Sequence, residues 1–170
     1  MITIRPETAE DYAAIREVTL LAFGQEKEAR LVEDLRHLSD FIPELSLVAV
    51  RAEHVIGHIL FSPMVIETEK GEVPALSLAP MSVRPECQNE GVGSQLVREG
   101  LKRCRSLGHE VVVVVGHPDY YPRFGFSSAR AKRLEAPFEV PDEAFLVLEL
   151  TPGALAGIAG VIKYPPPYNI

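Results

Sequence analysis

The chain has 170 residues, of which 46% are hydrophobic and 24% charged, so it is long enough to bury a sizeable core and is not typical of a disordered protein. Its formal net charge of −7 argues against a general nucleic-acid-binding protein, which would usually present a basic face. The two cysteines, Cys87 and Cys104, lack CxxC spacing and a matching histidine cluster, so the sequence predicts neither a disulfide framework nor a metal site.

The N-terminal half predicts a strand, two helices and a strand hairpin. β-branched residues in "MITIRP" favour a short strand, and Thr8 follows as a candidate helix cap. Apolar residues then recur at helical spacing within residues 7–23 and 25–38. The first apolar stripe is Ala14, Val18, Leu21 and Ala22, and the second is Ala29, Val32, Leu35 and Leu38. Two apolar runs on either side of "RAEH", residues 51–54, predict a hairpin.

The C-terminal half predicts a strand, a helix and a second strand in succession. The strand "ALSLAPMSV", residues 75–83, carries a proline that usually marks a bulge or an edge. A helix should end at Gly108, and the β-branched run "EVVVVVG" should be a strand buried on both faces. A last strand is expected in "AFLVLEL", and an irregular tail over 151–170, where three prolines follow one another. No linker divides the chain, so we expect one domain over 1–170.

Two glycines stand where the helix that should end at Gly108 begins. A helix N-terminus offers unpaired N–H groups and a partial positive charge, which suit a phosphate, and Gly91 and Gly93 would let it approach the backbone. The alternative is that both glycines allow the helix to pack closely on a strand. The spacing matches neither a P-loop nor the Rossmann fingerprint.

The stretch "LAPMSVRPECQNEGVGSQLV" resembles the acetyl-CoA-binding motif of the GNAT superfamily of N-acetyltransferases. The matching residues are Val83, Pro85, Gln88, Gly91 and Gly93. A second segment, "YPRFGF" at residues 121–126, resembles the family's Tyr-x-x-x-Gly-Phe. The resemblance covers most of the chain. It implies an α/β (α+β) fold with a mixed sheet of about six to seven strands, flanked by helices and splayed between residues 75–83 and 111–116.

The resemblance also implies acetyl-CoA as cosubstrate and no metal. The pyrophosphate would lie on the amides of residues 88–94, with added donors from Gln88 and Ser94, and the pantetheine arm along the backbone of Met81 and Val83. The expected cofactor-binding residues are Met81, Ser82, Val83, Gln88, Asn89, Glu90, Gly91, Val92, Gly93, Ser94, Tyr120 and Phe124. Contacts from Arg84, Arg98 or Arg123 to CoA phosphates are a further option.

Tyr121 stands where the family places a tyrosine near the CoA sulfur. A phenol can protonate the leaving thiolate, and a backbone N–H near residues 79–83 can stabilise the thioester oxygen during attack by an amine. Tyr120, its neighbour, is the rival for this role. The expected general base is Glu28 or His117, ahead of Glu26 and His58.

The sequence therefore predicts an acetyl-CoA-dependent N-acetyltransferase that acts on a primary amine of a small molecule or peptide by direct attack. A route through Cys87 is disfavoured because this residue would lie near the phosphates. The alternatives are a non-catalytic acyl-CoA-binding sensor and an interaction module without a ligand. The chain shows no secretory signal and no apolar stretch of membrane-spanning length, so we expect a cytoplasmic protein with no membrane or nucleic-acid partner. The sequence leaves open whether the chain forms a homodimer.

Overall fold

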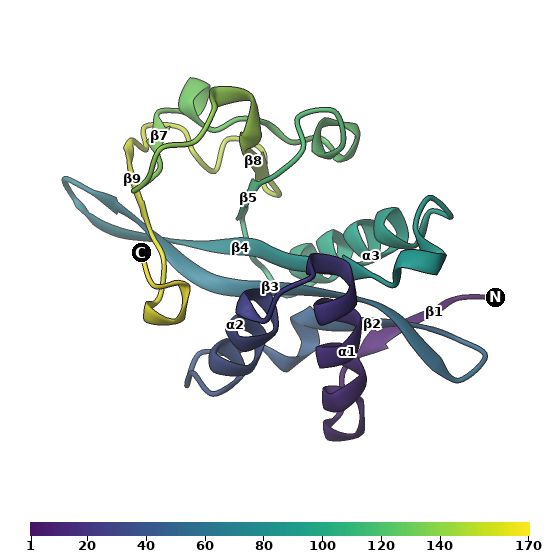
Figure 1. Cartoon of the computed structure of the whole chain (residues 1–170). Coiled ribbons are helices and arrows are strands. Elements are labelled where there is room, and N and C mark those ends of the chain that lie inside the picture. Colours follow the sequence, from purple (N-terminus) through teal and green to yellow (C-terminus); the bar gives the residue numbers. More distant parts are fainter. The chain divides into compact units, whose positions relative to one another are not determined.

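The computed structural model describes every residue from Met1 to Ile170 and confirms the predicted class, a mixed open sheet flanked by helices (Figure 1). The helices are α1 (Tyr12–Phe23), α2 (Lys27–Arg36) and α3 (Val92–Ser106). The strands are β1 (Thr3–Pro6), β2 (Ser46–Arg51), β3 (His54–Thr68), β4 (Gly71–Val83), β5 (Val111–Val115), β6 (Ser127–Ser128), β7 (Leu134–Glu135), β8 (Phe145–Glu149) and β9 (Gly160–Lys163). The nine strands exceed the predicted six to seven, because β6 and β7 have only two residues each and β9 lies in the tail.

The chain forms two compact units, and three long elements run from one into the other. The first unit comprises Met1–Ser62 and Ala79–Arg103, and the second comprises Pro63–Leu78 and Cys104–Ile170. Strands β3 and β4 and helix α3 each contribute residues to both units.

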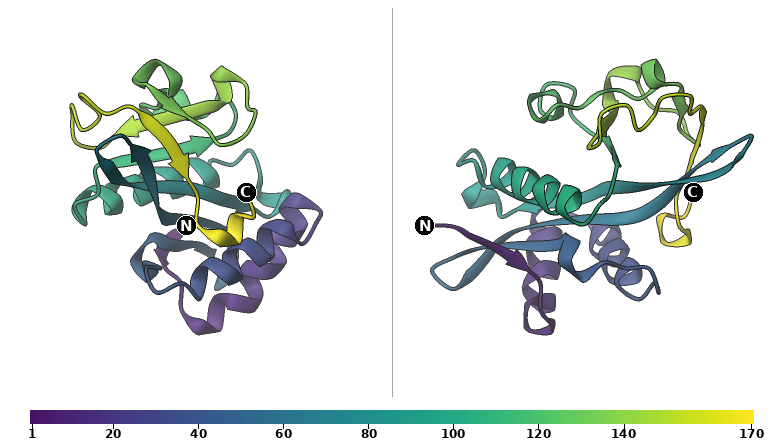
Figure 2. Two further views of the ribbon diagram at one scale, coloured as in Figure 1. Left: turned by 90° about the vertical axis from the view of Figure 1, so that its left-hand side faces the viewer. Right: turned by 180° about the vertical axis from the view of Figure 1, so that it is seen from behind.

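In the first unit, helices cover both faces of the antiparallel strands β1, β2 and β3, whose predicted hairpin turns at Ala52 and Glu53 (Figures 1 and 2). Helices α1 and α2 lie on one face and α3 lies on the other. A Cβ atom on Gly100 of α3 would lie 2.2 Å from the Phe61 ring, so this glycine lets α3 approach β3 closely. Alternation along β3 then directs odd-numbered residues near Phe61 toward α3 and even-numbered residues toward α1 and α2.

The two N-terminal helices form where the sequence predicts them, but one apolar stripe is displaced. Thr8 precedes the short 3-10 turn η1 (Ala9–Asp11) as its N-cap, and its N–H donates to Asp11 at 2.8 Å. The prediction for Leu21 was wrong, since that side chain is 47% exposed. The buried residues of α1 are Ile15, Val18 and Thr19, whereas Ala29, Val32 and Leu35 of α2 are buried as predicted.

The second unit has its own core, and it includes a strand in the tail that was predicted to be irregular. β5 pairs with β4 in parallel at Leu76–Val112 and Ser77–Val113, and with β8 in antiparallel orientation. Residues 111–114 of β5 are buried, as the unbroken valine run predicts. The tail is not wholly irregular, because β9 pairs with β3 and β7, and the three prolines begin only after it. The predicted splay between β4 and β5 stays a prediction.

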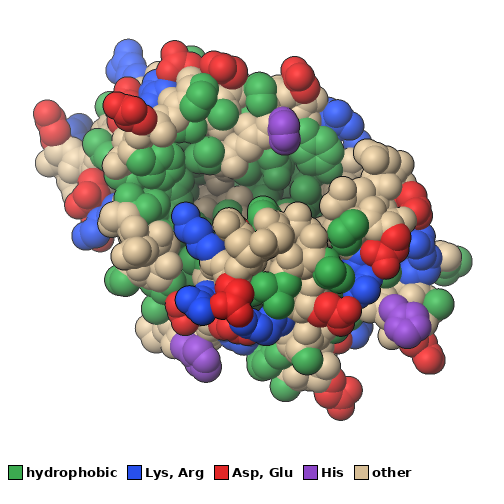
Figure 3. All heavy atoms as spheres, in the orientation of Figure 1, with side chains coloured by type: hydrophobic (Ala, Val, Ile, Leu, Met, Phe, Trp, Pro, Cys, Tyr) green, Lys and Arg blue, Asp and Glu red, His purple; other side chains and the backbone are tan.

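Charged side chains of both signs are interspersed over the face shown in Figure 3. No single-sign patch dominates this view. None of the helices has the length and apolar character needed to cross a bilayer. No group of three or more His, Cys, Asp or Glu side chains is arranged to hold a metal ion.

Candidate active site

The turn after β4 is held by hydrogen bonds from its own residues. The 3-10 turn η3 (Pro85–Cys87) follows Arg84, whose N–H donates to Ile56 O on β3 at 2.8 Å. The Gln88 side-chain amide donates to Val83 O at 3.1 Å. The side chain of Gln88 therefore holds the turn against the end of β4.

The backbone conformation at position 91 requires a glycine. Its φ of +85° lies in the left-handed region, and a Cβ atom there would have no neighbour within 4 Å. Close packing of α3 thus depends on Gly100 and not on Gly91. The first helical bond of α3 runs from Gln95 N–H to Gly91 O at 3.1 Å, so the amides of Val92 and Gly93 precede the helical ladder. These amides and the helix dipole favour an anion at this end.

Glu90 and Cys87 of the same turn both contact Arg51. Glu90 accepts a bond from Arg51 at 2.9 Å, so its charge is balanced within the protein. Arg51 also donates to Cys87 Sγ at 3.2 Å, and Cys87 is buried. Asn89 has a φ of +65°, which asparagine tolerates better than most residues. The side chain of Arg51, which sequence reasoning missed, ties the turn to the end of β2.

The end of β4 has a backbone edge in the first unit that points away from β3, and Val83 O on this edge accepts the bond from Gln88. Arg84 N–H points to β3, and Ser82 O lies 3.2 Å from the Cβ position of Gly57 on β3. Because backbone groups of successive strand residues point to opposite edges, those of Met81 and Val83 point away from β3. Such an edge can hold an extended ligand like an added strand.

Ser82 was predicted among the cofactor-binding residues, but its side chain faces α1. The side chain is buried, and its Oγ lies 3.4 Å from Thr19 Oγ1. Thr19 donates its only hydroxyl proton to Ile15 O at 2.7 Å, so Ser82 is the donor in the contact between them. The backbone oxygen of Ser82 faces β3, so neither its side chain nor its carbonyl group is directed to the edge formed by Met81 and Val83.

In the second unit, the aromatic segment after β5 forms a packed cluster. It folds as the 3-10 turn η4 (Tyr121–Phe124), which ends at Gly125 with a φ of +100°. The Tyr121 ring lies 5.1 Å from the Tyr120 ring and 5.7 Å from that of Phe126, measured between centroids. Phe124 packs on Tyr120 at 5.2 Å. The position of Tyr121 is therefore fixed by neighbouring rings.

The space for Tyr121 depends on Gly116, the residue after β5. A Cβ atom at Gly116 would lie 2.5 Å from Tyr121 Cε2. Tyr121 is only 8% exposed, and this burial, with a smaller contribution from Tyr120, raises the pKa of its phenol to about 12. The phenol thus stays protonated at neutral pH and can act as a proton donor.

The two predicted general bases lie in different units. Glu28 begins α2 in the first unit, and its carboxylate accepts bonds from Gln25 at 3.0 and 3.2 Å. His117 follows β5 in the second unit, is exposed, and accepts bonds from the N–H groups of Tyr120 and Tyr121 on its backbone oxygen. Neither side chain is held in a buried polar environment.

The arginines proposed for phosphate contacts are partly engaged elsewhere. Arg84 pairs with Glu17 at 3.3 Å and with Glu86 at 3.4 Å. Arg123 lies 4.7 Å from the centre of the Tyr120 ring and donates to Asp119 O. Arg98 is exposed on α3.

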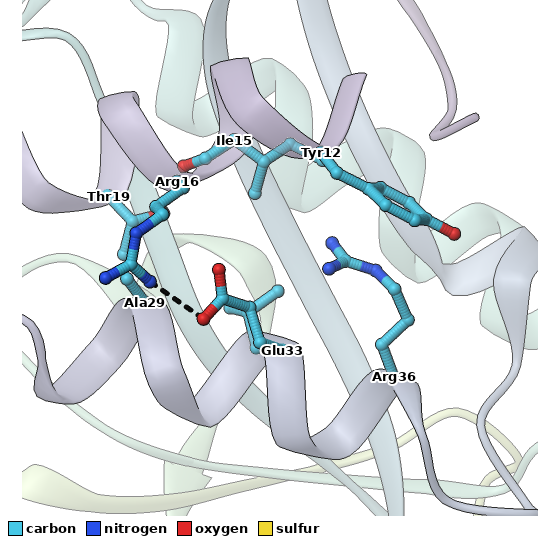
Figure 4. A pocket seen from close by; sticks show the side chains of 8 residues that line it. Tyr12, Ile15, Arg16, Thr19, Ala29, Glu33 and Arg36 are labelled. Carbon is cyan, nitrogen blue, oxygen red and sulfur yellow. Dashed lines mark hydrogen bonds and ion pairs between the residues drawn. The ribbon is translucent and has the colours of Figure 1, made fainter. Parts of the chain in front are cut away.

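A shallow hollow lies between α1 and α2 in the first unit (Figure 4). Arg16 and Glu33 form an ion pair of 2.7 Å across it. The guanidinium of Arg36 lies 3.9 Å from the centre of the Tyr12 ring. The charges that line the hollow are therefore paired within the protein.

A buried polar cluster behind this hollow was not predicted as a unit. Glu7 pairs with Arg36 at 2.8 Å, Ser46 Oγ lies 2.9 Å from His58 Nε2, and Glu7 also accepts a bond from Ser46. The His58 and Ser46 side chains are fully buried. No spacing in the sequence signals this cluster, because its members come from α2, β2, β3 and the loop after β1, which lie far apart in the chain.

Comparison with known proteins identifies the family of the chain. Residues 3–129 match the model of an acetyltransferase (GNAT) domain. The chain is 42% identical over 134 residues to the Escherichia coli N-acetyltransferase YjhQ, covering 78% of this chain and 74% of that one. It is 35% identical to the E. coli N-acetyltransferase YhbS over 167 residues, covering 98% of both chains.

Solved structures give the same result. The crystal structure of YhbS in complex with CoA aligns with a TM-score of 0.90 and 32% identity, over 99% of this chain and 92% of that one. A GNAT family acetyltransferase from Brucella melitensis, in complex with acetyl-CoA, aligns with a TM-score of 0.81 and 34% identity over 99% and 98%. The chain therefore belongs to the GNAT superfamily of N-acetyltransferases and is an acyltransferase.

Proposed function

We propose that this acyltransferase moves the acetyl group of acetyl-CoA to a primary amine of a small molecule or peptide by direct attack. The observation that carries the proposal is the start of α3, where Gly91 in a left-handed conformation precedes the amides of Val92 and Gly93. The CoA and acetyl-CoA complexes of the two structural relatives support acetyl-CoA as the cosubstrate.

The turn is the proposed pyrophosphate site. Backbone amides from residues 88–94, with the helix dipole, would neutralise part of the charge. The Glu90 carboxylate is paired with Arg51, which reduces its repulsion of a phosphate. In this proposal Asn89 and Glu90 contribute backbone rather than side-chain contacts.

The edge of β4 that points away from β3 is the proposed site for the pantetheine arm and the thioester. Backbone groups of Met81 and Val83 point to this edge, and an N–H there can stabilise the oxyanion that forms when an amine attacks the carbonyl. The state of Cys87 supports direct attack over a route through an acylated cysteine. Its thiol is buried and accepts a hydrogen bond from Arg51, so it is not exposed as a nucleophile.

Tyr121 is the proposed general acid. When the C–S bond breaks, its electron pair passes to sulfur, and the phenol can donate the proton that completes the thiol. The raised pKa keeps Tyr121 in the donor form, and Gly116 with the surrounding rings fixes its orientation. Tyr120 and Phe124 belong to the same cluster and are proposed to contact the cofactor.

The first test is thermal unfolding of the protein with and without acetyl-CoA. At a ligand concentration 100 times Kd, binding should add ~2.7 kcal/mol to the free energy of unfolding. A panel of amines, peptides and polyamines is then screened with acetyl-CoA, and release of free thiol is measured. Binding without thiol release for any acceptor would favour the acyl-CoA sensor, and absence of binding would overturn the proposal.

A further inference from the structure

The hairpin formed by β2 and β3 has an irregular backbone at the end that carries its turn. The pairing of the two strands shifts by one residue after Ala49–Gly57, so that Ile56 has no partner on β2. The hairpin turn consists of Ala52 and Glu53, which both have a left-handed φ, +50° and +66°. This conformation is uncommon in residues other than glycine, and such residues cluster at functional sites. A bulge and a tight turn together set the direction of the side chains at the strand end.

The register of the hairpin places Arg51, the last residue of β2, on the face that α3 covers. Ala49 pairs with Gly57, and a Cβ atom on Gly57 would lie 3.2 Å from the Val92 side chain at the start of α3. Paired residues of neighbouring strands share a face, and so do residues two apart on one strand. Arg51 therefore points toward the start of α3.

The hairpin holds the turn before α3 at both of its ends. At the beginning of the turn, Ile56 O accepts a bond from the Arg84 N–H at 2.8 Å. Further along, the Arg51 guanidinium donates from one nitrogen to Glu90 at 2.9 Å and from another to Cys87 Sγ at 3.2 Å. A single side chain thus spans the residues that directly precede the amides of the proposed phosphate site.

Glu90 carries a charge that can compete with a phosphate for these amides. It is the residue directly before Gly91, whose carbonyl group accepts the first helical bond of α3. A carboxylate near a helix N-terminus is attracted by the unpaired N–H groups and the helix dipole, as a phosphate is. In the structure this carboxylate is bonded to Arg51 instead. The Glu90 side chain is 45% exposed, so it would be free to turn to the amides without Arg51.

We propose that Arg51 is a positioning residue for the cofactor. It holds the Glu90 carboxylate away from the start of α3, so that the pyrophosphate of acetyl-CoA occupies the amides there. This inference rests on the proposed function, which assigns the pyrophosphate to this turn. Arg51 acts through Glu90 and not by contact with the phosphate. The second guanidinium bond, to Cys87, fixes the direction in which Arg51 holds its partner.

The size of the effect follows from the charge that Arg51 balances. Two unit charges ~8 Å apart change an affinity by about 6- to 30-fold when the effective dielectric constant lies between ~40 and ~20. Without Arg51, the Glu90 carboxylate would repel the pyrophosphate to this extent. Salt screens exposed charges, since the Debye length falls from ~10 Å at ~0.1 M to ~3 Å at ~1 M. The effect should therefore be largest at low salt.

The test measures the Kd of acetyl-CoA by calorimetry for Arg51→Gln, Glu90→Gln and the double variant, at ~0.05 M and ~0.5 M NaCl. Arg51→Lys is included because it keeps the charge but not the fork of two donors. The matched control is the ion pair of Arg103 and Glu99 on α3, which has a length of 3.2 Å and similar exposure. Glu99 lies ~12 Å along the helix from Gly91, so the same substitutions there change surface charge without touching the turn.

We expect Arg51→Gln to raise Kd about 6- to 30-fold at low salt, and by less at high salt. Removal of the competing carboxylate should restore binding, so Glu90→Gln and the double variant should stay within ~3-fold of the wild type. Arg51→Lys should also stay within ~3-fold, whereas a purely structural need for the fork would weaken it as much as Arg51→Gln. Arg103→Gln and Glu99→Gln should leave Kd within the same ~3-fold range.

A double variant that binds as weakly as Arg51→Gln would overturn the inference, because Arg51 would then act on the phosphate or on the fold of the turn. An unchanged Kd in Arg51→Gln would overturn it as well. If circular dichroism shows that Arg51→Gln does not fold, Glu90→Gln decides. A Kd at or below that of the wild type supports the inference, and weaker binding refutes it. Absence of acetyl-CoA binding by the wild type would instead overturn the proposed function, and this inference with it.

Discussion

The most direct prediction concerns Gly91 and uses Gly108 as a matched control. Both glycines have a left-handed φ, +85° and +87°, and an added Cβ would meet no atom within 4 Å at either position. Substitution by tryptophan therefore strains the backbone equally, by ~1–2 kcal/mol. Only Gly91 adjoins the proposed phosphate site, whereas Gly108 follows the other end of α3.

The two variants should unfold at similar temperatures but respond differently to acetyl-CoA. For a chain of this size ~1 kcal/mol shifts Tm by ~2–4 °C, so strain should lower both midpoints by ~2–8 °C. At 100 times Kd, the ligand should raise Tm of the wild type and of Gly108→Trp by ~5–11 °C. Gly91→Trp should lose most of this increase, because its side chain covers the amides of Val92 and Gly93.

The assay is differential scanning fluorimetry over a range of acetyl-CoA concentrations, with circular dichroism to confirm that each variant is folded. A full ligand-induced shift in Gly91→Trp would refute the phosphate site at this turn. An equal loss in Gly108→Trp would show that strain in α3, rather than contact with the cofactor, lowers the affinity.

Three further predictions follow from the buried groups. Tyr121→Phe keeps the ring packing and should lower kcat by ~10²-fold or more at unchanged acetyl-CoA affinity. Because the pKa of Tyr121 is about 12, the activity of the wild type should not fall between pH 7 and pH 10. A fall in activity near pH 9 that is absent from Tyr121→Phe would contradict this assignment. Gly116→Ala places a Cβ 2.5 Å from the Tyr121 ring and should cost ~1–3 kcal/mol in urea unfolding, a cost that should shrink in a Tyr121→Ala background. Burial raises the pKa of Glu7, but hydrogen bonds from His58, Arg36 and Ser46 outweigh it and lower the pKa to about 2, so stability should be full above the unfolded pKa near 4.5 and decrease as pH falls toward 2. Glu7→Gln should flatten this dependence in acid titrations of the free energy of unfolding, and an unchanged slope would show that Glu7 is not the group responsible.

Local patterns in the sequence were sufficient for most of the elements. Helical periodicity predicted α2 and its buried face, and the valine run predicted that β5 is buried. The stripe of α1 was misplaced at Leu21, because periodicity alone does not say which of two adjacent residues faces the sheet. The tail was read as irregular because proline dominated its composition, although β9 precedes the prolines and pairs with β3.

The candidate site was predictable where its chemistry lies in consecutive residues. The turn around Gly91 and the segment from Tyr121 to Phe126 are local motifs, since a helix start and a tight turn are formed by neighbouring residues. The sequence did not predict where the Ser82 side chain lies. Strand alternation and the position of α1 together bury it against Thr19.

Residues that are close in the chain were enough to predict the family, the three helices, the strands β1–β5 and β8 in their order, and the glycine at the start of α3. Only the tertiary structure showed that Gly100 packs on Phe61, that Arg51 pairs with Glu90, and that Glu7, Arg36, Ser46 and His58 form one buried cluster. These contacts join residues far apart in the sequence. The hydrogen bonds that lower the pKa of Glu7 form only when those residues are packed together.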